Sequence, residues 1–194
     1  MPVRLLLVVL VSVALGTSAC SDDGDGGSPR STATTAPQQA ALRWEVGPVD
    51  PQGTAPPDPA VVAAVEGTLD AYLQQAVVVP LRTGKPAAGL EAVLSAAALE
   101  RVAADPAARS TLLDEGLPPA TTSIRAERAT AALTSVAGPD GVTAVVGARL
   151  DLALRARGPG LEVDIVRQGE LTLVQEGDGW RIDSFQLRTQ RDSR

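Results

Sequence analysis

The sequence predicts an α+β protein in which N-terminal helices pack on a curved antiparallel sheet of about four strands. Two observations support this fold class. Between residues 58 and 116, apolar residues recur at helical spacing after Asp-Pro dipeptides that mark helix starts. Beyond Pro119 the apolar residues alternate with polar ones instead, and Gly-rich turns separate the alternating segments. We therefore expect a single folded domain over residues 58–190.

The first helix is expected to begin at Asp58, which can cap it, and Pro59, which suits the first turn. Because proline lacks an amide hydrogen and its ring meets the preceding turn, Pro80 is expected to end this helix. The expected inward residues are Val62, Val65, Leu69, Tyr72 or Leu73, and Ala76.

Two shorter helices are expected to follow. The first covers residues 90–103, where apolar residues again fall on one face. The second begins at Asp105 and Pro106, and it is expected to end near Gly116 and Pro118.

The segments after these helices alternate as strands do. The first covers residues 124–136, and a later one, over residues 161–173, is expected to contain a bulge at Gln168 and Gly169. The closing strand covers residues 180–189. The clearest alternation covers residues 146–155, between the segments 124–136 and 161–173. It predicts a strand with one buried face and one solvent-exposed face. Its expected inward residues are Val146, Ala148, Leu150, Leu152 and Leu154.

Composition excludes several classes of function. The net charge of -6 gives no electrostatic reason for the chain to approach nucleic acid, so a nucleic-acid partner is rejected. The chain contains no histidine, which excludes Ser-His-Asp catalysis and imidazole metal ligands within it. The Gly-rich stretches also lack phosphate-binding spacing. We therefore predict neither a metal site nor a cofactor.

Residues 1–19 have the pattern of a signal peptide, with a positive start, an apolar run and a small-residue segment. The segment Ser18, Ala19 and Cys20, which holds the only cysteine, resembles the lipobox of bacterial lipoproteins. That resemblance implies cleavage between Ala19 and Cys20 and a diacylglyceryl anchor on Cys20, on the outer face of the cell membrane. Thr17 departs from the usual leucine, so ordinary secretory cleavage stays open as an alternative.

Residues 20–57 are expected to form a flexible tether after the lipidated cysteine, because much of this stretch is rich in Gly, Pro, Ser and Thr. Within it, residues 42–46 alternate like a short strand or an anchoring arm. After them, the prolines at positions 48, 51, 56 and 57 are expected to prevent regular structure, and residues 42–57 are expected to pack on the domain surface.

The order of elements, with the closing segment Trp180-Arg181-Ile182-Asp183-Ser184-Phe185, resembles the nuclear-transport-factor-2-like cone fold. This superfamily includes ketosteroid isomerase-like and polyketide cyclase-like proteins, and the likeness covers residues 58–188. The whole layout is also similar to actinobacterial lipoproteins of unknown function, on segments such as residues 114–118 and 167–171. These resemblances imply a cone-shaped cavity at the cell envelope, but no particular reaction.

Few residues qualify for a site in such a cavity. Tyr72 could donate its hydroxyl into it, although a tyrosine at helical spacing more often packs in a core. Asp183 could also point inward. Asp151 is expected on the wet face of its strand, where Arg149 or Arg155 can pair with it.

Two classes of function remain. The first is an accessory module that binds an apolar small molecule or an envelope protein. An aliphatic cone outside a membrane could enclose a small molecule, or its surface could dock a protein. The second is a small isomerase-like or cyclase-like enzyme that uses a pocket carboxylate with a raised pKa. Binding is favoured, since no constellation of residues in the sequence requires catalysis. A homodimer formed through the sheet face is also compatible with this pattern.

Overall fold

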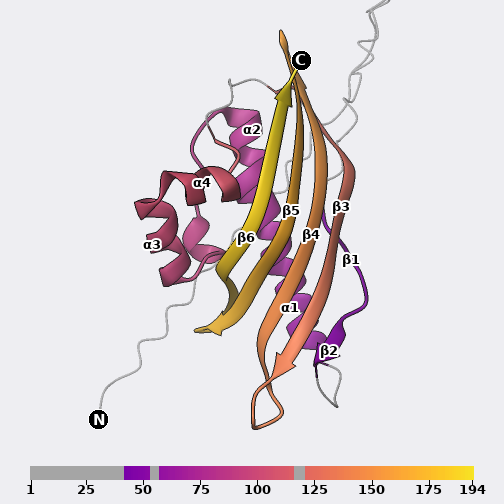
Figure 1. The fold of residues 1–194 in the computed structure, drawn as a ribbon, viewed down its shortest axis with the longest axis vertical. Coiled ribbons are helices and arrows are strands. Elements are labelled where there is room, and N and C mark those ends of the chain that lie inside the picture. The colour runs from indigo at the N-terminus through magenta and orange to yellow at the C-terminus, as the bar shows by residue number, and fades with distance from the viewer. Residues whose placement is uncertain (1–41, 53–56, 116–120) are drawn as a thin grey trace, which may run out of the picture. The chain divides into compact units, whose positions relative to one another are not determined.

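The computed structural model describes residues 42–52, 57–115 and 121–194 of the 194-residue chain. The expected signal peptide, Cys20 and most of the expected tether lie outside these ranges. Within them, helices pack on one side of a six-stranded sheet (Figure 1). The α+β class is therefore confirmed.

Four long antiparallel strands make up most of the sheet (Figure 1). Strands that follow one another in sequence are also neighbours in the sheet. The first two are joined by a turn at Gly141, where φ is 78°, a conformation that glycine adopts without strain. The long strands are β3 (Ser123–Ala137), β4 (Thr143–Gly158), β5 (Leu161–Glu176) and β6 (Gly179–Ser193).

Two short strands make the sheet larger than the sequence predicted. β1 (Glu45–Val46) and β2 (Asp50–Gln52) both run parallel to β3 and pair with it at the edge of the sheet. Both lie upstream of Asp58, within the stretch expected to be tether. Pro51 lies inside β2, so the expectation that prolines prevent regular structure here is wrong at this position. An edge strand tolerates proline because one side of its backbone needs no partner.

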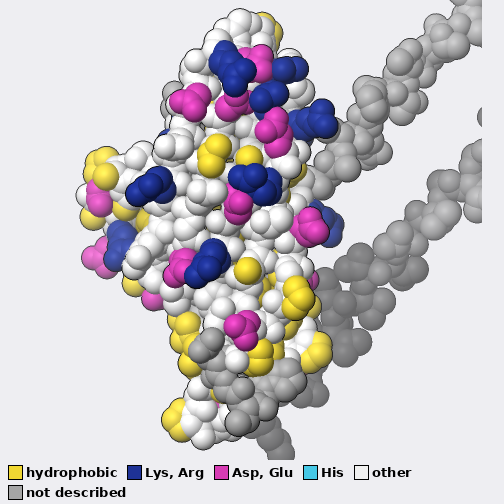
Figure 2. Space-filling model, turned by 45° about the vertical axis from the view of Figure 1, so that its right-hand side comes forward, with side chains coloured by type: hydrophobic (Ala, Val, Ile, Leu, Met, Phe, Trp, Pro, Cys, Tyr) yellow, Lys and Arg dark blue, Asp and Glu magenta, His cyan; other side chains and the backbone are white. Residues whose placement is uncertain are grey.

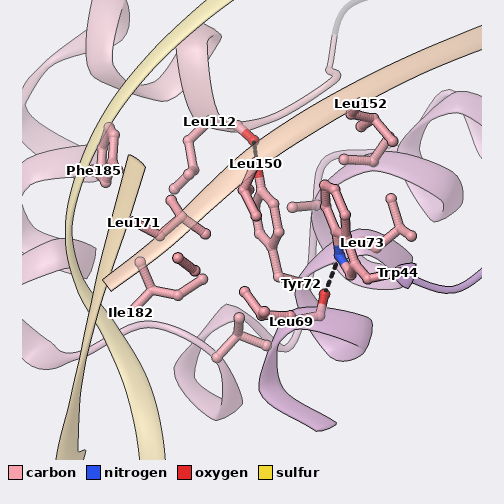
Figure 3. Close-up of a cluster of buried hydrophobic side chains, with 14 of the residues drawn as sticks. Trp44, Leu69, Tyr72, Leu73, Leu112, Leu150, Leu152, Leu171, Ile182 and Phe185 are labelled. Atoms are coloured by element: carbon pink, nitrogen blue, oxygen red, sulfur yellow. Dashed lines mark hydrogen bonds between the residues drawn. The ribbon is translucent and has the colours of Figure 1, made fainter. Parts of the chain in front are cut away.

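Trp44 anchors this arm to the first helix. Its side chain is buried, and its indole nitrogen donates a hydrogen bond to the Leu69 carbonyl at 2.9 Å (Figure 3). Its backbone N–H donates to the Asp70 carboxylate at 3.1 Å. The Gln74 side chain also donates to the Leu42 carbonyl, at 2.7 Å. The strand expected within residues 42–46 is thus present, and Trp44 holds it against the helix.

The first helix begins where the sequence predicted. α1 (Pro59–Tyr72) is capped by the Asp58 carboxylate, which accepts the N–H of Ala60 at 2.8 Å. Its buried face includes Val65, Leu69 and Tyr72, as expected.

The helical path does not end at Pro80, however. It continues through a π-helix (Leu73–Val78) into α2 (Val79–Thr83). The wider turn just before the proline displaces the carbonyl that the ring would otherwise meet. The Ala76 carbonyl, four residues before Pro80, accepts the N–H of Asp114 at 2.9 Å. The proline therefore follows a π-helical segment whose Ala76 carbonyl is bonded to the loop after α4.

The helix expected over residues 90–103 is interrupted. A 3₁₀ turn, η2 (Leu90–Ala92), is separated from α3 (Ala96–Ala104) by a short non-helical stretch. In that stretch the Ser95 N–H donates to the Ile182 carbonyl, and the Ile182 N–H donates to the Val93 carbonyl, each at 2.9 Å. The edge of β6 therefore hydrogen-bonds to backbone groups that were expected to bond within the helix.

The last helix is shorter than expected. α4 (Pro106–Leu112) is capped by the Asp105 carboxylate, which accepts the N–H of Ala107 at 2.8 Å. The expected end residues Gly116 and Pro118 lie outside the described residues.

The core lies between the helices and the inner face of the sheet. Figure 3 shows Leu150 and Leu152 of β4 close to Tyr72 and Leu73 of the helical layer. The alternation predicted for β4 is confirmed, because its five expected inward residues are all buried. The same face of the sheet adds further buried side chains from β5 and β6, which are Val163, Ile165, Leu171, Leu173, Trp180, Ile182 and Phe185.

The bulge expected at Gln168 and Gly169 is wrong. Both residues pair in continuous register with β4 and β6 in the described sheet. The shift in register falls instead between Thr172 and Leu173, opposite Asp183 of β6. Because β5 alternates without interruption before this shift, Arg167 falls on the inner face.

Candidate functional site

A cluster of polar side chains is buried under the helices. The Arg167 guanidinium donates to the Asp114 carboxylate at 2.8 Å and to the Tyr72 hydroxyl at 3.0 Å. All three side chains are buried from solvent. Burial of charges costs several kcal/mol unless they are paired and hydrogen-bonded, so these groups depend on one another.

Two half-buried side chains of β6 complete this cluster. The buried cluster, as it is called below, comprises Tyr72, Asp114, Arg167, Thr189 and Arg191. The Arg167 Nε atom donates to the Thr189 hydroxyl at 3.0 Å, and that hydroxyl donates to the carbonyl of Thr111, in α4, at 2.8 Å. Arg191 reaches the second Asp114 oxygen at 2.8 Å. The cluster therefore ties α1, α4, β5 and β6 together.

The Tyr72 hydroxyl is fully committed within the cluster. It donates to the Leu112 carbonyl at 3.0 Å while it accepts from Arg167 (Figure 3 shows the bond to Leu112). Burial raises the pKa of Tyr72 above its usual value of 10.0, although the charge of Arg167 acts in the opposite direction. Burial also disfavours the charge of Arg167, but its interactions with Tyr72 and Asp114 outweigh that effect and raise its pKa.

Asp183, the second residue expected to face a pocket, lies at the register shift of β6. Its carboxylate accepts a hydrogen bond from the Ser95 hydroxyl at 2.8 Å. The same hydroxyl accepts the N–H of Ala98 at 3.1 Å and so caps α3. Among the described residues no hydrogen bond joins Asp183 to Tyr72. The structure therefore places the two in different local networks.

Asp151 lies on the outer face of the sheet, as expected, but its partners differ from those predicted. It pairs with Arg128 at 2.6 Å and accepts from Gln168 at 3.0 Å. Arg149 pairs with Glu170 instead, and Arg155 pairs with Asp164, Glu162 and Glu127. The hydrogen bond from Gln168 and the charge of Arg128 lower the pKa of Asp151. A lowered pKa keeps this carboxylate ionised, which is the opposite of the raised pKa that a pocket base would need.

A groove crosses this outer face beside β1. One part of it encloses about 750 Å³ between the arm at Glu45–Pro48 and the strands β3, β4 and β5. A second hollow of about 630 Å³ adjoins it toward β2. The two hollows share four lining residues, Pro48, Ala132, Arg149 and Glu170, so they form one groove.

The outer face is not uniform along its length. Figure 2 shows charged side chains of both signs gathered toward the upper end and hydrophobic side chains gathered toward the lower end. The lower end carries the β3–β4 turn, where Val136 and Val142 are 43% and 58% exposed. The groove reaches the lower region, because Val136 lines one of its two hollows.

Arg167 is the residue that sequence reasoning missed, and the sequence held a signal for it. The inward residues Val163, Ile165, Leu171 and Leu173 of β5 all have odd numbers, and Arg167 shares that parity. The groove had no such signal, because it depends on parallel pairing between the arm and β3.

No protein-family model, curated protein or solved structure matches this chain. Within the described ranges no group of acidic or sulfur-bearing side chains is placed to hold a metal ion. No helix of the described residues is long and apolar enough to cross a membrane. A function must therefore be inferred from the surfaces and side chains of the domain itself.

Proposed function

We propose that this protein is an extracytoplasmic lipoprotein, anchored to the cell membrane through Cys20, whose domain docks an envelope protein. The observation that carries the docking proposal is the contrast between the two faces of the sheet. The inner face is filled by buried aliphatic side chains and the buried cluster. The outer face carries an open groove. We therefore favour a protein partner on the outer face over an apolar ligand inside the cone.

The resemblance to the nuclear-transport-factor-2-like cone is part of this proposal. A helical layer against the inner face of a sheet of long antiparallel strands is compatible with it. The proposal also includes an origin in an actinobacterial envelope, which rests on the sequence resemblance alone. The enzyme hypothesis gains no support from its two carboxylates, because Asp151 is held in an ion pair and Asp183 in a capping network. A fold of this kind does not by itself imply a reaction.

The membrane anchor is tested on protein taken from the membranes of its host. We expect the mature chain to begin at Cys20 and to carry a covalent diacylglyceryl group there, detectable by mass spectrometry. The Cys20→Ala variant should be released from the membrane fraction, because a two-chain lipid anchor provides the stable attachment. An unmodified chain cleaved at another position would contradict the anchor and favour ordinary secretion.

Docking is tested by photo-crosslinking in the host. A benzophenone side chain at Ala132, exposed on the groove floor, is expected to crosslink to one protein in intact membranes. The same side chain at Ala97, exposed on α3, is the matched control and should not. Equal crosslinking from both positions would contradict docking through the outer face, and a crosslink to a second copy of this chain would identify the partner as a homodimer.

A further inference from the structure

Two carboxylates on the arm beside the outer groove have no partner among the described residues. Glu45 of β1 and Asp50 of β2 are both exposed, and neither forms an ion pair or a side-chain hydrogen bond with any of the described residues. Each lines one of the two hollows of the groove. The other acidic side chains of the groove are paired, since Asp151 pairs with Arg128 and Glu170 with Arg149.

The pairing of the arm with β3 fixes the spacing of these two carboxylates. Glu45 lies opposite Thr130 and Asp50 lies opposite Thr134 in register with β3. At a rise of about 3.3 Å per residue, positions 130 and 134 are separated by about 13 Å along the strand. An extended chain that follows this direction presents residues i and i+4 on one side at the same spacing.

The floor of the groove is made of small side chains. Ala132 is exposed at its centre, Gly147 adds no side chain, and Thr130 and Thr134 are half-buried beside them. A floor of this kind lets an incoming backbone lie close to the sheet. The groove therefore combines a shallow, small-residue floor with a wall of unpaired negative charge.

The charge of the groove decides between the possible occupants. Among the residues that the structure describes, four carboxylates line it against a single guanidinium, that of Arg149. The chain's own segment at residues 21–39 is itself acidic, with aspartates at positions 22, 23 and 25. A second copy would bring the same negative groove, and an anionic lipid surface would also be repelled. A cationic polypeptide is the class of partner that this charge attracts.

We propose that the groove binds an extended, cationic segment of a partner protein, in which two lysine or arginine residues four positions apart pair with Glu45 and Asp50. This inference rests on the proposed docking function and specifies the partner's chemistry. Because both carboxylates are exposed, the contribution of the charges is modest and weakens as salt screens them. The spacing, rather than the charge alone, provides the specificity.

The test uses the mature protein in detergent and two synthetic peptides of one composition, built from Lys, Val, Thr and Ala. One peptide has its two lysines four residues apart, and the other has them three apart, which places them on opposite sides of an extended chain. Binding is measured by fluorescence anisotropy at low ionic strength. The four-apart peptide is expected to bind on the order of fivefold more tightly.

The double variant Glu45→Gln/Asp50→Asn should bind the two peptides equally. The control variant Glu91→Gln/Glu100→Gln changes the net charge by the same amount at exposed positions on the helical side and should keep the preference. Equal binding of both peptides by the unmodified protein, or a preference that survives in the double variant, would overturn the proposal. If neither peptide binds while Ala132 still crosslinks a partner, docking stands and the cationic partner is rejected. If Ala132 crosslinks nothing while the spacing preference is seen, the groove binds such segments but the proposed docking in the envelope fails.

Discussion

The guanidinium of Arg167 and the carboxylate of Asp114 lie 2.8 Å apart, and both side chains are fully buried. Arg167 belongs to β5, whereas Asp114 follows α4, so the pair joins elements that are distant in sequence. Asp114 is fixed further by its backbone, because its N–H donates to the Ala76 carbonyl at 2.9 Å. The loop after α4 is therefore held against the sheet by charge and against the helical path by a backbone bond.

Replacement of Arg167 should destabilise the protein strongly. The Arg167→Met variant removes the buried cation and leaves Asp114 with Arg191 as its remaining charged partner. Breaking a buried pair from one side typically costs about 3–5 kcal/mol, and we expect a value near the lower end because Arg191 remains. The free energy of unfolding is measured by urea denaturation, with Trp44 and Trp180 as buried reporters.

Arg128→Met provides the control for this measurement. Arg128 pairs with Asp151 at 2.6 Å, but its side chain is 48% exposed. Loss of an exposed pair should cost less than about 1 kcal/mol. Equal losses in the two variants would mean that the Arg167 pair does not hold the core together.

The single tyrosine of the chain allows the buried cluster to be followed by titration. Burial raises the pKa of Tyr72 above 10.0, so the folded state holds this proton more tightly than the unfolded state does. The contribution to stability is therefore complete below about pH 10 and is lost as the pH rises from there toward the folded pKa. We expect the phenolate absorbance of the native protein to appear only above pH 10, together with the loss of tryptophan burial. In urea the same group should titrate near pH 10, and a native titration that matches it would contradict the burial of Tyr72.

Periodicity alone was enough to predict most of the fold. The alternation in β4 identified its inner face because one side of an antiparallel sheet is buried and the other is wet. The start of α1 was also predictable, since an Asp58 cap and a Pro59 first turn are local features. The continuation of the helical path past Pro80 could not be predicted from periodicity, because the π-helix before the proline departs from the regular helical period.

The candidate site was far less predictable. Glu45 and Asp50 come together in one groove because two short strands pair in parallel with β3, and pairing between distant segments leaves no mark on local spacing. The interruption at Ser95 has the same origin, since the edge of β6 competes with the helix for its backbone groups. Arg167 was within reach of the alternation, because it shares the parity of the buried residues on either side of it in β5.

Gly169 should not tolerate a side chain. It pairs with Leu187 of β6 at a φ of 140°, and a Cβ atom added there would overlap the carbonyl oxygen of Gln186. The Gly169→Ala variant is expected to lose at least about 2 kcal/mol of unfolding free energy, because the backbone must move to relieve the overlap. Thermal unfolding followed by circular dichroism measures this loss.

Gly67→Ala is the matched control for that substitution. Gly67 lies inside α1, is exposed, and has open space where a Cβ would be added. Alanine favours a helix over glycine, so this variant should gain about 0.5–1 kcal/mol. A tolerated alanine at Gly169 would contradict the close approach of β5 and β6, whereas a loss of stability at Gly67 would contradict the open space found at that position of α1.

The link between Ser95 and Asp183 should behave as one structural unit. Ser95→Ala removes both the cap of α3 and the donor to Asp183, so a loss of about 1–2 kcal/mol is expected. Asp183→Ala should lose about 1 kcal/mol, and the double variant should lose less than the sum, with a coupling of at least about 0.5 kcal/mol. Asp178→Ala, in the exposed β5–β6 turn, is the control and should change little. Strictly additive losses at Ser95 and Asp183 would show that the carboxylate does not support the cap. Asp183 would then again be a candidate carboxylate for the pocket of the enzyme hypothesis.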